Sequence, residues 1–337
     1  MSQKYSNRGE FDLINDMVKR WSNSGVLGDI GDDAALLPFG DDAYQAVTTD
    51  MLIQGRHFKP EWSSWADIGY KAIAVNFSDI AAMGGQCDHV FISLGLTEEL
   101  TSSDHFDHLI SGMDEICQKY NCRIDGGDTT RSEMDAIISV TALGRVEKDH
   151  TKKRNAAVPG DIVAVTGTLG DAAAALALLS DQTTNSSSNS TKLFEKLHRP
   201  EPRIPEGLQF GKKPEVHAMM DLSDGLAGDI RHIMNRSGCG AQIHLDQLPL
   251  SDELRYTAEL NSWDPENIAA RGGDDYELMF TVDADTWENF RNWASRELAV
   301  PVTAIGTITE DENELSFLRN HRKVSGDLQS YDHFKSK

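Results

Sequence analysis

The chain has 337 residues, and 32 Lys and Arg against 54 Asp and Glu give it a formal net charge of −22. So acidic a chain lacks the basic face that nucleic acids and anionic membrane surfaces require, which excludes both as partners. Its 39% hydrophobic and 26% charged residues are nevertheless those of a folded protein, and its length predicts two domains.

The first half of the chain alternates between helical and strand-like patterns. The apolar spacing of Phe11, Ile14, Val18 and Trp21 predicts an amphipathic helix that stops before Gly25. Further along, the hydrophobic pattern predicts a strand at 43–49, a helix at 66–83, a strand at 90–96, a helix at 106–117 and a strand at 137–146. This alternation is typical of an α/β domain.

A basic, polar stretch at 148–155, followed by Pro159 and Gly160, predicts a boundary between domains at 1–148 and 149–337. The second half repeats the rhythm, with a strand at 162–165, a helix at 171–179, a strand at 217–220, a helix at 225–234 and a strand at 242–245. Residues 180–191 (SDQTTNSSSNST) include no apolar side chain, so we expect a mobile surface loop there.

The cysteines and the apolar runs bear on cellular location. The four cysteines form no C-x-x-C pair, which favours a reducing compartment over a zinc site or a disulfide framework. No signal-peptide pattern opens the chain, and the longest apolar run, 172–179, is far shorter than the roughly 20 residues that span a bilayer. We therefore expect a cytoplasmic protein.

Acidic residues gather at six motifs that border apolar segments: 31–33 (GDD), 48–50 (TTD), 78–79 (SD), 126–128 (GGD), 221–225 (DLSDG) and 272–275 (GGDD). We expect these motifs in turns at the ends of strands and helices, where binding sites form. Any one of them alone would more often be a turn or a helix cap than a ligand, but six together weaken that interpretation. The spacing of Asp221 and Asp224 also fits a ligand at a strand end followed by a helix N-cap.

If these carboxylates converge, their repulsion requires divalent cations among them, and oxygen ligands with neighbouring hydroxyls favour Mg²⁺ over zinc or copper. Mg²⁺ held by few protein ligands completes its coordination with water and substrate phosphate, so the pattern indicates nucleotide phosphate chemistry. The P-loop, the dinucleotide-binding fingerprint, the protein-kinase motifs and the EF-hand loop are all absent from the sequence. A phosphate-transfer enzyme must therefore use another fold.

Seven motifs together carry a family likeness: 28–37 (GDIGDDAALL), 48–58 (TTDMLIQGRHF), 71–85 (KAIAVNFSDIAAMGG), 126–131 (GGDTTR), 221–226 (DLSDGL), 272–278 (GGDDYEL) and 331–334 (YDHF). In this order, and over nearly the whole chain, they resemble the thiamine-monophosphate kinase family of the aminoimidazole ribonucleotide synthetase superfamily. The resemblance implies a two-domain PurM-like α/β fold that dimerises through its N-terminal sheets. It also implies ATP-dependent phosphorylation of thiamine monophosphate to thiamine diphosphate, the last step in the biosynthesis of that cofactor.

The same resemblance implies a role for individual residues. Several Mg²⁺ ions per site are expected on Asp33, Thr48, Thr49, Asp50, Asp79, Asp128, Asp221 and Asp224. Contacts with ATP are expected from Gly127, Asp128, Arg154 and Ser223, and contacts with thiamine monophosphate from His57, Asp274 and Tyr331. Asp274 stands where relatives often carry Glu, so its reach to the substrate is one methylene shorter.

This reaction needs neither a covalent nucleophile nor an obligatory base. The second pKa of a phosphate monoester is about 6, so the acceptor is mostly a dianion at neutral pH. Phosphoryl transfer then asks chiefly for alignment and positive charge, and we expect direct in-line transfer. His57 can donate to the acceptor phosphate, and Arg154 can bind ATP phosphates. Tyr331 can stack on the pyrimidine, while Asp274 or Asp275 can offer charge to the thiazolium.

Two alternatives stay open. The first is another enzyme of the superfamily. Selenophosphate synthetases and hydrogenase-maturation members carry a cysteine in a glycine-rich N-terminal stretch or at the C-terminus, where this sequence has none, and aminoimidazole ribonucleotide synthetase fits His57 and the YDHF segment poorly. The second is a non-catalytic sensor of divalent cations or nucleotides, which would use the acidic motifs but has no need of His57 and Asp274 together.

Overall fold

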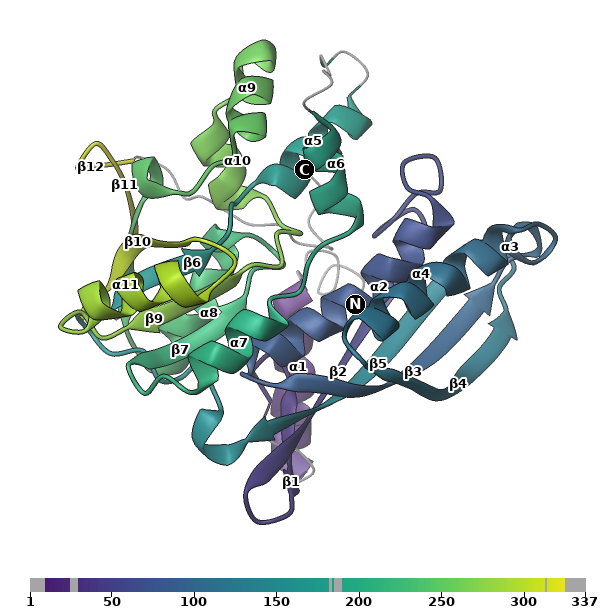
Figure 1. Ribbon diagram of the computed structural model, residues 1–337, viewed down its shortest axis with the longest axis horizontal. Coiled ribbons are helices and arrows are strands. Elements are labelled where there is room, and N and C mark those ends of the chain that lie inside the picture. The colour runs from purple at the N-terminus through teal and green to yellow at the C-terminus, as the bar shows by residue number, and fades with distance from the viewer. Residues whose placement is uncertain (1–9, 25–29, 182–183, 185–189, 313, 325–337) are drawn as a thin grey trace, which may run out of the picture.

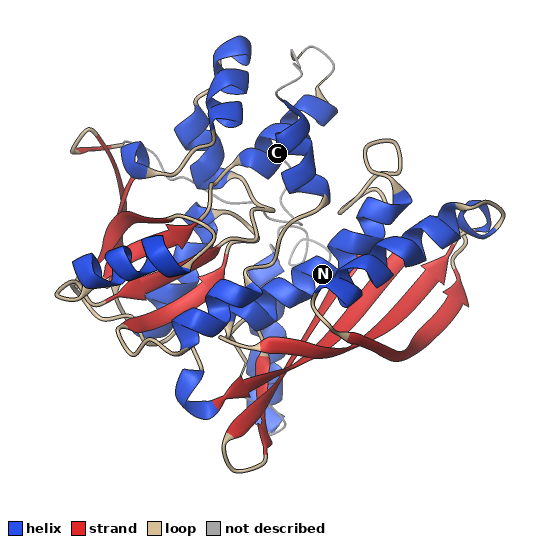
Figure 2. Ribbon diagram, viewed as in Figure 1, coloured by secondary structure: helices blue, strands red, loops and turns tan. Residues whose placement is uncertain are grey.

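The computed structural model describes residues 10–24, 30–181, 184, 190–312 and 314–324. Within this part of the chain the strands form two sheets, one from each half of the sequence (Figures 1 and 2). The first sheet has five strands in the order β1-β2-β5-β3-β4, and the second has seven in the order β12-β11-β8-β10-β6-β9-β7. This arrangement confirms the mixed α/β class predicted from the sequence.

The first sheet is formed by β1 (Ala35–Phe39), β2 (Ala43–Ile53), β3 (Gln86–Leu96), β4 (Arg123–Arg131) and β5 (Ile137–Glu147). Its strands pair antiparallel except β3 and β4, which are parallel. The helices of this half are α1 (Glu10–Ser24), α2 (Trp65–Ala82), α3 (Glu98–Thr101) and α4 (His105–Lys119).

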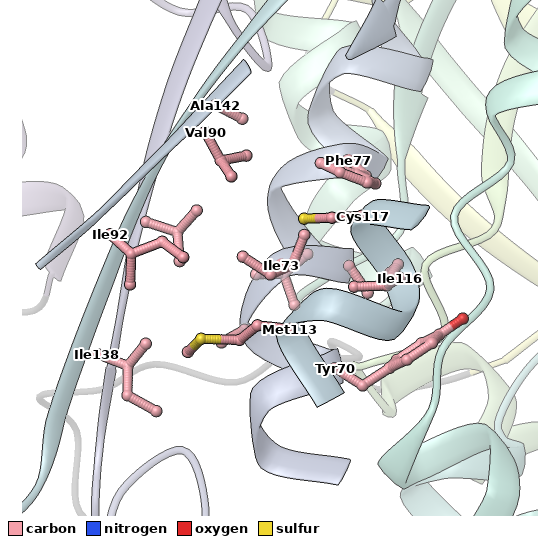
Figure 3. Close-up of a cluster of buried hydrophobic side chains, with 14 of the residues drawn as sticks. Tyr70, Ile73, Phe77, Val90, Ile92, Met113, Ile116, Cys117, Ile138 and Ala142 are labelled. Atoms are coloured by element: carbon pink, nitrogen blue, oxygen red, sulfur yellow. The ribbon is translucent and has the colours of Figure 1, made fainter. Parts of the chain in front are cut away.

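Helices α2 and α4 cover one face of the first sheet, and Figure 3 shows the apolar layer between these helices and the sheet. Its labelled side chains include Ile73, Phe77, Val90, Ile92, Met113, Ile116, Ile138 and Ala142. The opposite face of the sheet carries large apolar side chains that stay exposed: Leu37 is 52%, Met51 53% and Phe91 41% accessible.

Helix α2 is the element that joins the two halves of the structure. The Ser64 side chain caps it by accepting a hydrogen bond from the Asp67 N–H at 3.2 Å. Besides the first sheet and α4, it contacts α7 (Ile204–Gly211) and β7 (Val216–Asp221) of the second half. Because it is packed on several sides, even polar residues such as Lys71 and Ser78 are buried. Polar side chains on this helix are therefore held in the interior, between the two sheets.

The second sheet adds β6 (Ile162–Thr166), β8 (Gly240–His244), β9 (Leu278–Val282), β10 (Val302–Thr309), β11 (Leu315–Arg319) and β12 (Arg322–Lys323) to β7. The remaining helices are α5 (Asp171–Ser180), α6 (Thr191–His198), α8 (Leu226–Ser237), α9 (Asp252–Asn261), α10 (Pro265–Arg271) and α11 (Trp287–Glu297). No helix in the described residues is both long and apolar enough to cross a membrane.

Every element predicted from the sequence has a counterpart, with ends shifted by a few residues; the helix predicted at 66–83, for example, is α2. One expectation is wrong: three of the six acidic motifs lie inside regular elements and not in turns. Thr48 and Asp50 belong to β2, Asp79 to α2 and Asp128 to β4. The expected loop at 180–191 begins with the last residue of α5 and ends with the first of α6, and most of its residues lie outside the described part of the chain.

Candidate active site

Three aspartates from distant parts of the sequence converge between the two sheets. Asp33 precedes β1, Asp79 lies in the last turn of α2, and Asp221 ends β7. One carboxylate oxygen from each lies within 4.8 Å of the others. Two hydroxyls line the same place: Thr48 Oγ1 donates to Asp79 at 2.5 Å, and Ser78 Oγ donates to Asp221 at 2.7 Å. The cluster therefore joins the N-terminal sheet, α2 and the C-terminal sheet.

The negative charge of this cluster is poorly compensated by the protein. Burial raises the pKa of Asp79 and of Asp221 well above the usual range, and neighbouring carboxylates raise both further. Burial also raises the pKa of Asp50 to about 6, with the charge of Asp224 adding to the effect. Within the described residues, the cationic side chain that pairs with the cluster is Arg154, whose Nη2 lies 2.6 Å from Asp33 Oδ1.

These residues have the character of a divalent-cation site. All donors are carboxylate or hydroxyl oxygens, which suit Mg²⁺. The raised pKa values of Asp79 and Asp221 mark buried carboxylates that neighbouring carboxylates repel. A bound cation would remove that repulsion, so the donor set fits the ion expected from the sequence.

The 221–225 turn is held by a residue that the sequence motifs do not include. The buried carboxylate of Asp229, in the first turn of α8, accepts hydrogen bonds from the N–H groups of Ser223, Asp224 and Gly225 at 3.1, 3.2 and 3.1 Å. Asp221 ends a strand as predicted, but the N-cap of α8 is Gly225, not Asp224. Gly225 has φ +106, and a Cβ there would lie 2.7 Å from the Gly272 carbonyl. Asp224 is thereby kept in a turn close enough to Asp50 for its charge to raise the pKa of that residue.

The 272–277 segment is bonded directly to that turn. The Asp274 N–H donates to the Ser223 carbonyl, and the Tyr276 N–H donates to the Leu222 carbonyl, both at 2.8 Å. The Asp274 carboxylate accepts from Lys71 Nζ and from the Tyr276 hydroxyl, each at 2.9 Å. The two acidic motifs of the C-terminal half thus form one rigid unit beside the cluster.

Asp275 points elsewhere. Its buried carboxylate accepts two hydrogen bonds from the Gly170 N–H, at 2.9 and 3.1 Å, and burial raises its pKa well above the usual range. These contacts fix the turn before α5 and leave Asp275 without a role toward the thiazolium. Of the two acids considered from the sequence, only Asp274 is open to a substrate.

Arg203 and Lys196 bind a buried carboxylate, that of Glu277, but no sequence motif could reveal this because both lie far from Glu277 along the chain. Glu277 is fully buried. Its carboxylate accepts hydrogen bonds from Arg203 at 2.5 and 2.6 Å, from Lys196 at 3.1 Å and from the Thr166 hydroxyl at 2.7 Å. Burial alone would raise the pKa of Glu277, but Arg203 and Lys196 hold it below its usual range. This network anchors the strand that follows the 272–277 segment.

Asp128 and Gly127 are not brought to the cluster. Asp50 of β2, Val140 of β5, Ile92 of β3 and Gly127 of β4 lie in one row across the sheet. Three strand spacings, about 14 Å, therefore separate β4 from β2. The neighbouring row, which holds Asp128, also holds Met51 and so belongs to the face opposite α2.

Three other residues expected in the site are not part of the cluster: Thr49 and His57 lie elsewhere, and Tyr331 is not among the described residues. The Thr49 hydroxyl donates to the Val140 carbonyl at 3.1 Å on the sheet face opposite Thr48. His57 lies exposed after β2, and its Nδ1 accepts from the Ile53 N–H at 3.0 Å, which leaves the ring proton on Nε2. Tyr331 lies outside the described residues.

Comparison with known proteins places this geometry in a family. The model of the N-terminal domain of AIR synthase related proteins matches residues 31–146, and that of the C-terminal domain matches 158–317. The thiamine-monophosphate kinase of Escherichia coli (strain K12) is 38% identical over 333 residues, which cover 97% of this chain and 98% of the relative. The chain belongs to the thiamine-monophosphate kinase family.

The chain is similar to other members of the thiamine-monophosphate kinase family over nearly its whole length. The Bacillus subtilis (strain 168) protein is 35% identical over 97% of this chain and 99% of its own length. The solved structure of AaThiL complexed with AMPPCP and TMP has a TM-score of 0.84 at 33% identity and covers 98% of this chain and 99% of that chain. The PurM-like fold and the enzyme class predicted from the sequence, a kinase with a phosphate group as acceptor, are thus confirmed.

Proposed function

We propose that the chain transfers the terminal phosphoryl group of ATP to thiamine monophosphate, giving thiamine diphosphate and ADP. The observation that carries the proposal is the convergence of Asp33, Asp79 and Asp221 within 4.8 Å in a member of this kinase family. Two anionic phosphates must meet in this reaction, so a site that gathers cations is what the chemistry needs. The proposed setting is a cytoplasmic enzyme with domains at 1–148 and 149–337.

Mg²⁺ would be held by the carboxylates and hydroxyl that face one another. In this chain they are Asp33, Thr48, Asp50, Asp79, Asp221 and Asp224, with Thr49 and Asp128 proposed as further ligands. When bound, the ions supply positive charge to the transferring oxygens and hold both phosphates in line. Ser78 and Asp229 keep these ligands in place through the hydrogen bonds described above.

The protein side chains then bind and orient. Arg154 lies at the cluster, where its guanidinium can fork onto ATP phosphates, and we assign Ser223 and Gly127 to the same nucleotide. His57 carries its proton on Nε2 and can donate it to the acceptor phosphate. Asp274 and Tyr331 are assigned to the rest of the substrate. The monoester dianion attacks directly as the bond to ADP breaks, with no phosphorylated protein and no base.

We further propose that the enzyme is a homodimer and that Asp128 acts in the site of the partner subunit. Its own chain holds Asp128 about three strand spacings from β2. Asp128 also shares a sheet face with Met51 and Phe91, two of the exposed apolar residues that a second copy would cover. A mixing experiment tests this. Asp79→Asn and Asp128→Asn should each be inactive alone, but a random mixture of the two should recover about a quarter of wild-type activity, because half of its dimers are mixed and each of these has one intact site. No recovery would assign Asp128 to its own chain.

The function itself is tested by turnover. Purified protein is incubated with ATP, Mg²⁺ and thiamine monophosphate, and thiamine diphosphate and ADP are measured. We expect equal amounts of the two products and no ³²P-labelled protein after incubation with labelled ATP. Asp79→Asn serves as the inactive control. Binding of ATP and Mg²⁺ without any turnover would favour the non-catalytic sensor instead.

A further inference from the structure

The Lys71 side chain reaches from α2 to the 272–277 segment of the other half, and no step of the proposed reaction uses it. Its Nζ lies 2.9 Å from Asp274 Oδ2, with only 11% of the side chain exposed. Burying an ammonium group is costly unless a partner compensates for it. The position of Lys71 is therefore specified by Asp274, with which it forms an ion pair.

A second group fixes the same carboxylate from the other side. The Tyr276 hydroxyl donates to Asp274 Oδ1 at 2.9 Å, and its ring is buried in the core of the N-terminal half. Asp274 and Tyr276 both have positive φ, +68° and +49°, which costs energy for residues other than glycine. Their N–H groups hold this conformation through bonds to Ser223 and Leu222. Asp274 is thus aimed by Lys71, by Tyr276 and by its own backbone.

The place of this unit along α2 indicates which end of the substrate it meets. Lys71 precedes Asp79 by eight residues, which corresponds to about 12 Å along a helix. In the proposed function, phosphoryl transfer takes place at the Asp79 end. The end of thiamine monophosphate that lies farthest from its phosphate is the aminopyrimidine, and a molecule extended along α2 carries that ring toward Lys71 and Asp274.

We propose that Lys71 and Tyr276 are positioning residues that aim Asp274 at the exocyclic amino group of the substrate pyrimidine, and that they thereby select a ring bearing this group. The proposal rests on the proposed function. Each carboxylate oxygen has two lone pairs, so Oδ1 and Oδ2 can each accept one more N–H. The Asp274 side chain is 33% exposed and so remains open to a ligand. Because the charge of Lys71 offsets that of Asp274, the unit offers hydrogen bonds and little net charge to the thiazolium.

The test compares thiamine monophosphate with oxythiamine monophosphate, in which an oxo group replaces the amino group. The wild type should prefer the amino substrate by about a hundred-fold in kcat/KM, because the analogue leaves Asp274 facing an acceptor. Lys71→Met should raise the KM for thiamine monophosphate about ten-fold or more, leave the KM for ATP unchanged and reduce the preference below about ten-fold. Lys71→Arg, which keeps the charge, should restore part of the preference.

Lys119→Met is the control, because Lys119 also joins the two halves through an ion pair, with Glu201, and that pair does not include Asp274. It should behave as the wild type. Tyr276→Phe keeps the buried ring and removes only the donor, so it repeats the test if Lys71→Met does not fold. An unchanged preference in these variants overturns the proposal. So does a lower kcat at unchanged KM, which would place Lys71 on the phosphates. Wild-type protein that phosphorylates neither compound would instead overturn the proposed function.

Discussion

Glu277 and the cluster of Asp33, Asp79 and Asp221 are acids in the same interior, but only Glu277 is matched by cations of the protein. Arg203 and Lys196 bind Glu277, and its pKa is lowered despite burial. In the cluster Arg154 forms an ion pair with Asp33, and although its charge also acts on Asp221, the pKa values of Asp79 and Asp221 are raised. A compensated acid contributes to the fold, whereas an uncompensated cluster strains it and awaits a cation. The contrast separates a structural network from a functional one.

The largest effect should come from removing one acid of the cluster. Asp79→Asn takes away a metal ligand and keeps the shape of the side chain, so turnover should fall at least about a thousand-fold. The fold should survive, because the mutation also removes a buried charge that its neighbours repel. Steady-state rates and circular dichroism measure the two properties. Near-normal kcat at ordinary Mg²⁺ would remove Asp79 from the metal site.

The same change at Glu277 should act on stability first. Glu277→Gln leaves Arg203 and Lys196 without their shared carboxylate, which should lower the free energy of unfolding by about 3–5 kcal/mol. Urea unfolding at neutral pH measures the loss. The paired variant Arg203→Met/Glu277→Met removes both charges and should recover part of it. A Glu277→Gln protein as stable as the wild type would erase the distinction between the two sites.

The acids of the cluster could be predicted from the sequence, whereas pairs between residues far apart along the chain could not. Asp79 and Asp221 stand out because hydroxyl-bearing residues and glycines flank them next to apolar segments. Lys71 lies in an apolar helical run, 203 residues from its partner Asp274, so no local pattern connects them. Strand β4 was also missed, since as an exposed edge strand it lacks the alternation of apolar side chains that marks a buried one. Tertiary pairing decided these features.

Adding a cation should compensate the charge of the aspartate cluster, as Arg203 and Lys196 compensate that of Glu277. Mg²⁺ at a hundred times its dissociation constant should stabilise the metal-free protein by about 2.7 kcal/mol, provided that only the folded state binds it. Thermal unfolding with and without Mg²⁺ measures the shift in Tm. Asp79→Asn should lose most of this shift. A Glu277→Gln protein should keep it, although its unfolding starts from a lower temperature. A shift retained in Asp79→Asn would locate the ion elsewhere.

The smallest expected effect is a pH dependence of opposite sign at the two sites. Burial and Asp224 raise the pKa of Asp50 from 3.8 to about 6, so between these values the folded state holds more protons than the unfolded one, and stability falls as pH rises. Glu277, with a lowered pKa, contributes stability that is lost only as pH falls below its usual 4.5. In EDTA, lowering the pH from 7 to 5 should therefore stabilise the protein by at least about 1 kcal/mol, which Asp50 alone would contribute. Asp50→Asn should lose part of this gain, and saturating Mg²⁺ should abolish it, because the bound ion already favours the ionised carboxylates. A metal-free protein that loses stability over this interval would mean that the cluster is compensated as fully as Glu277.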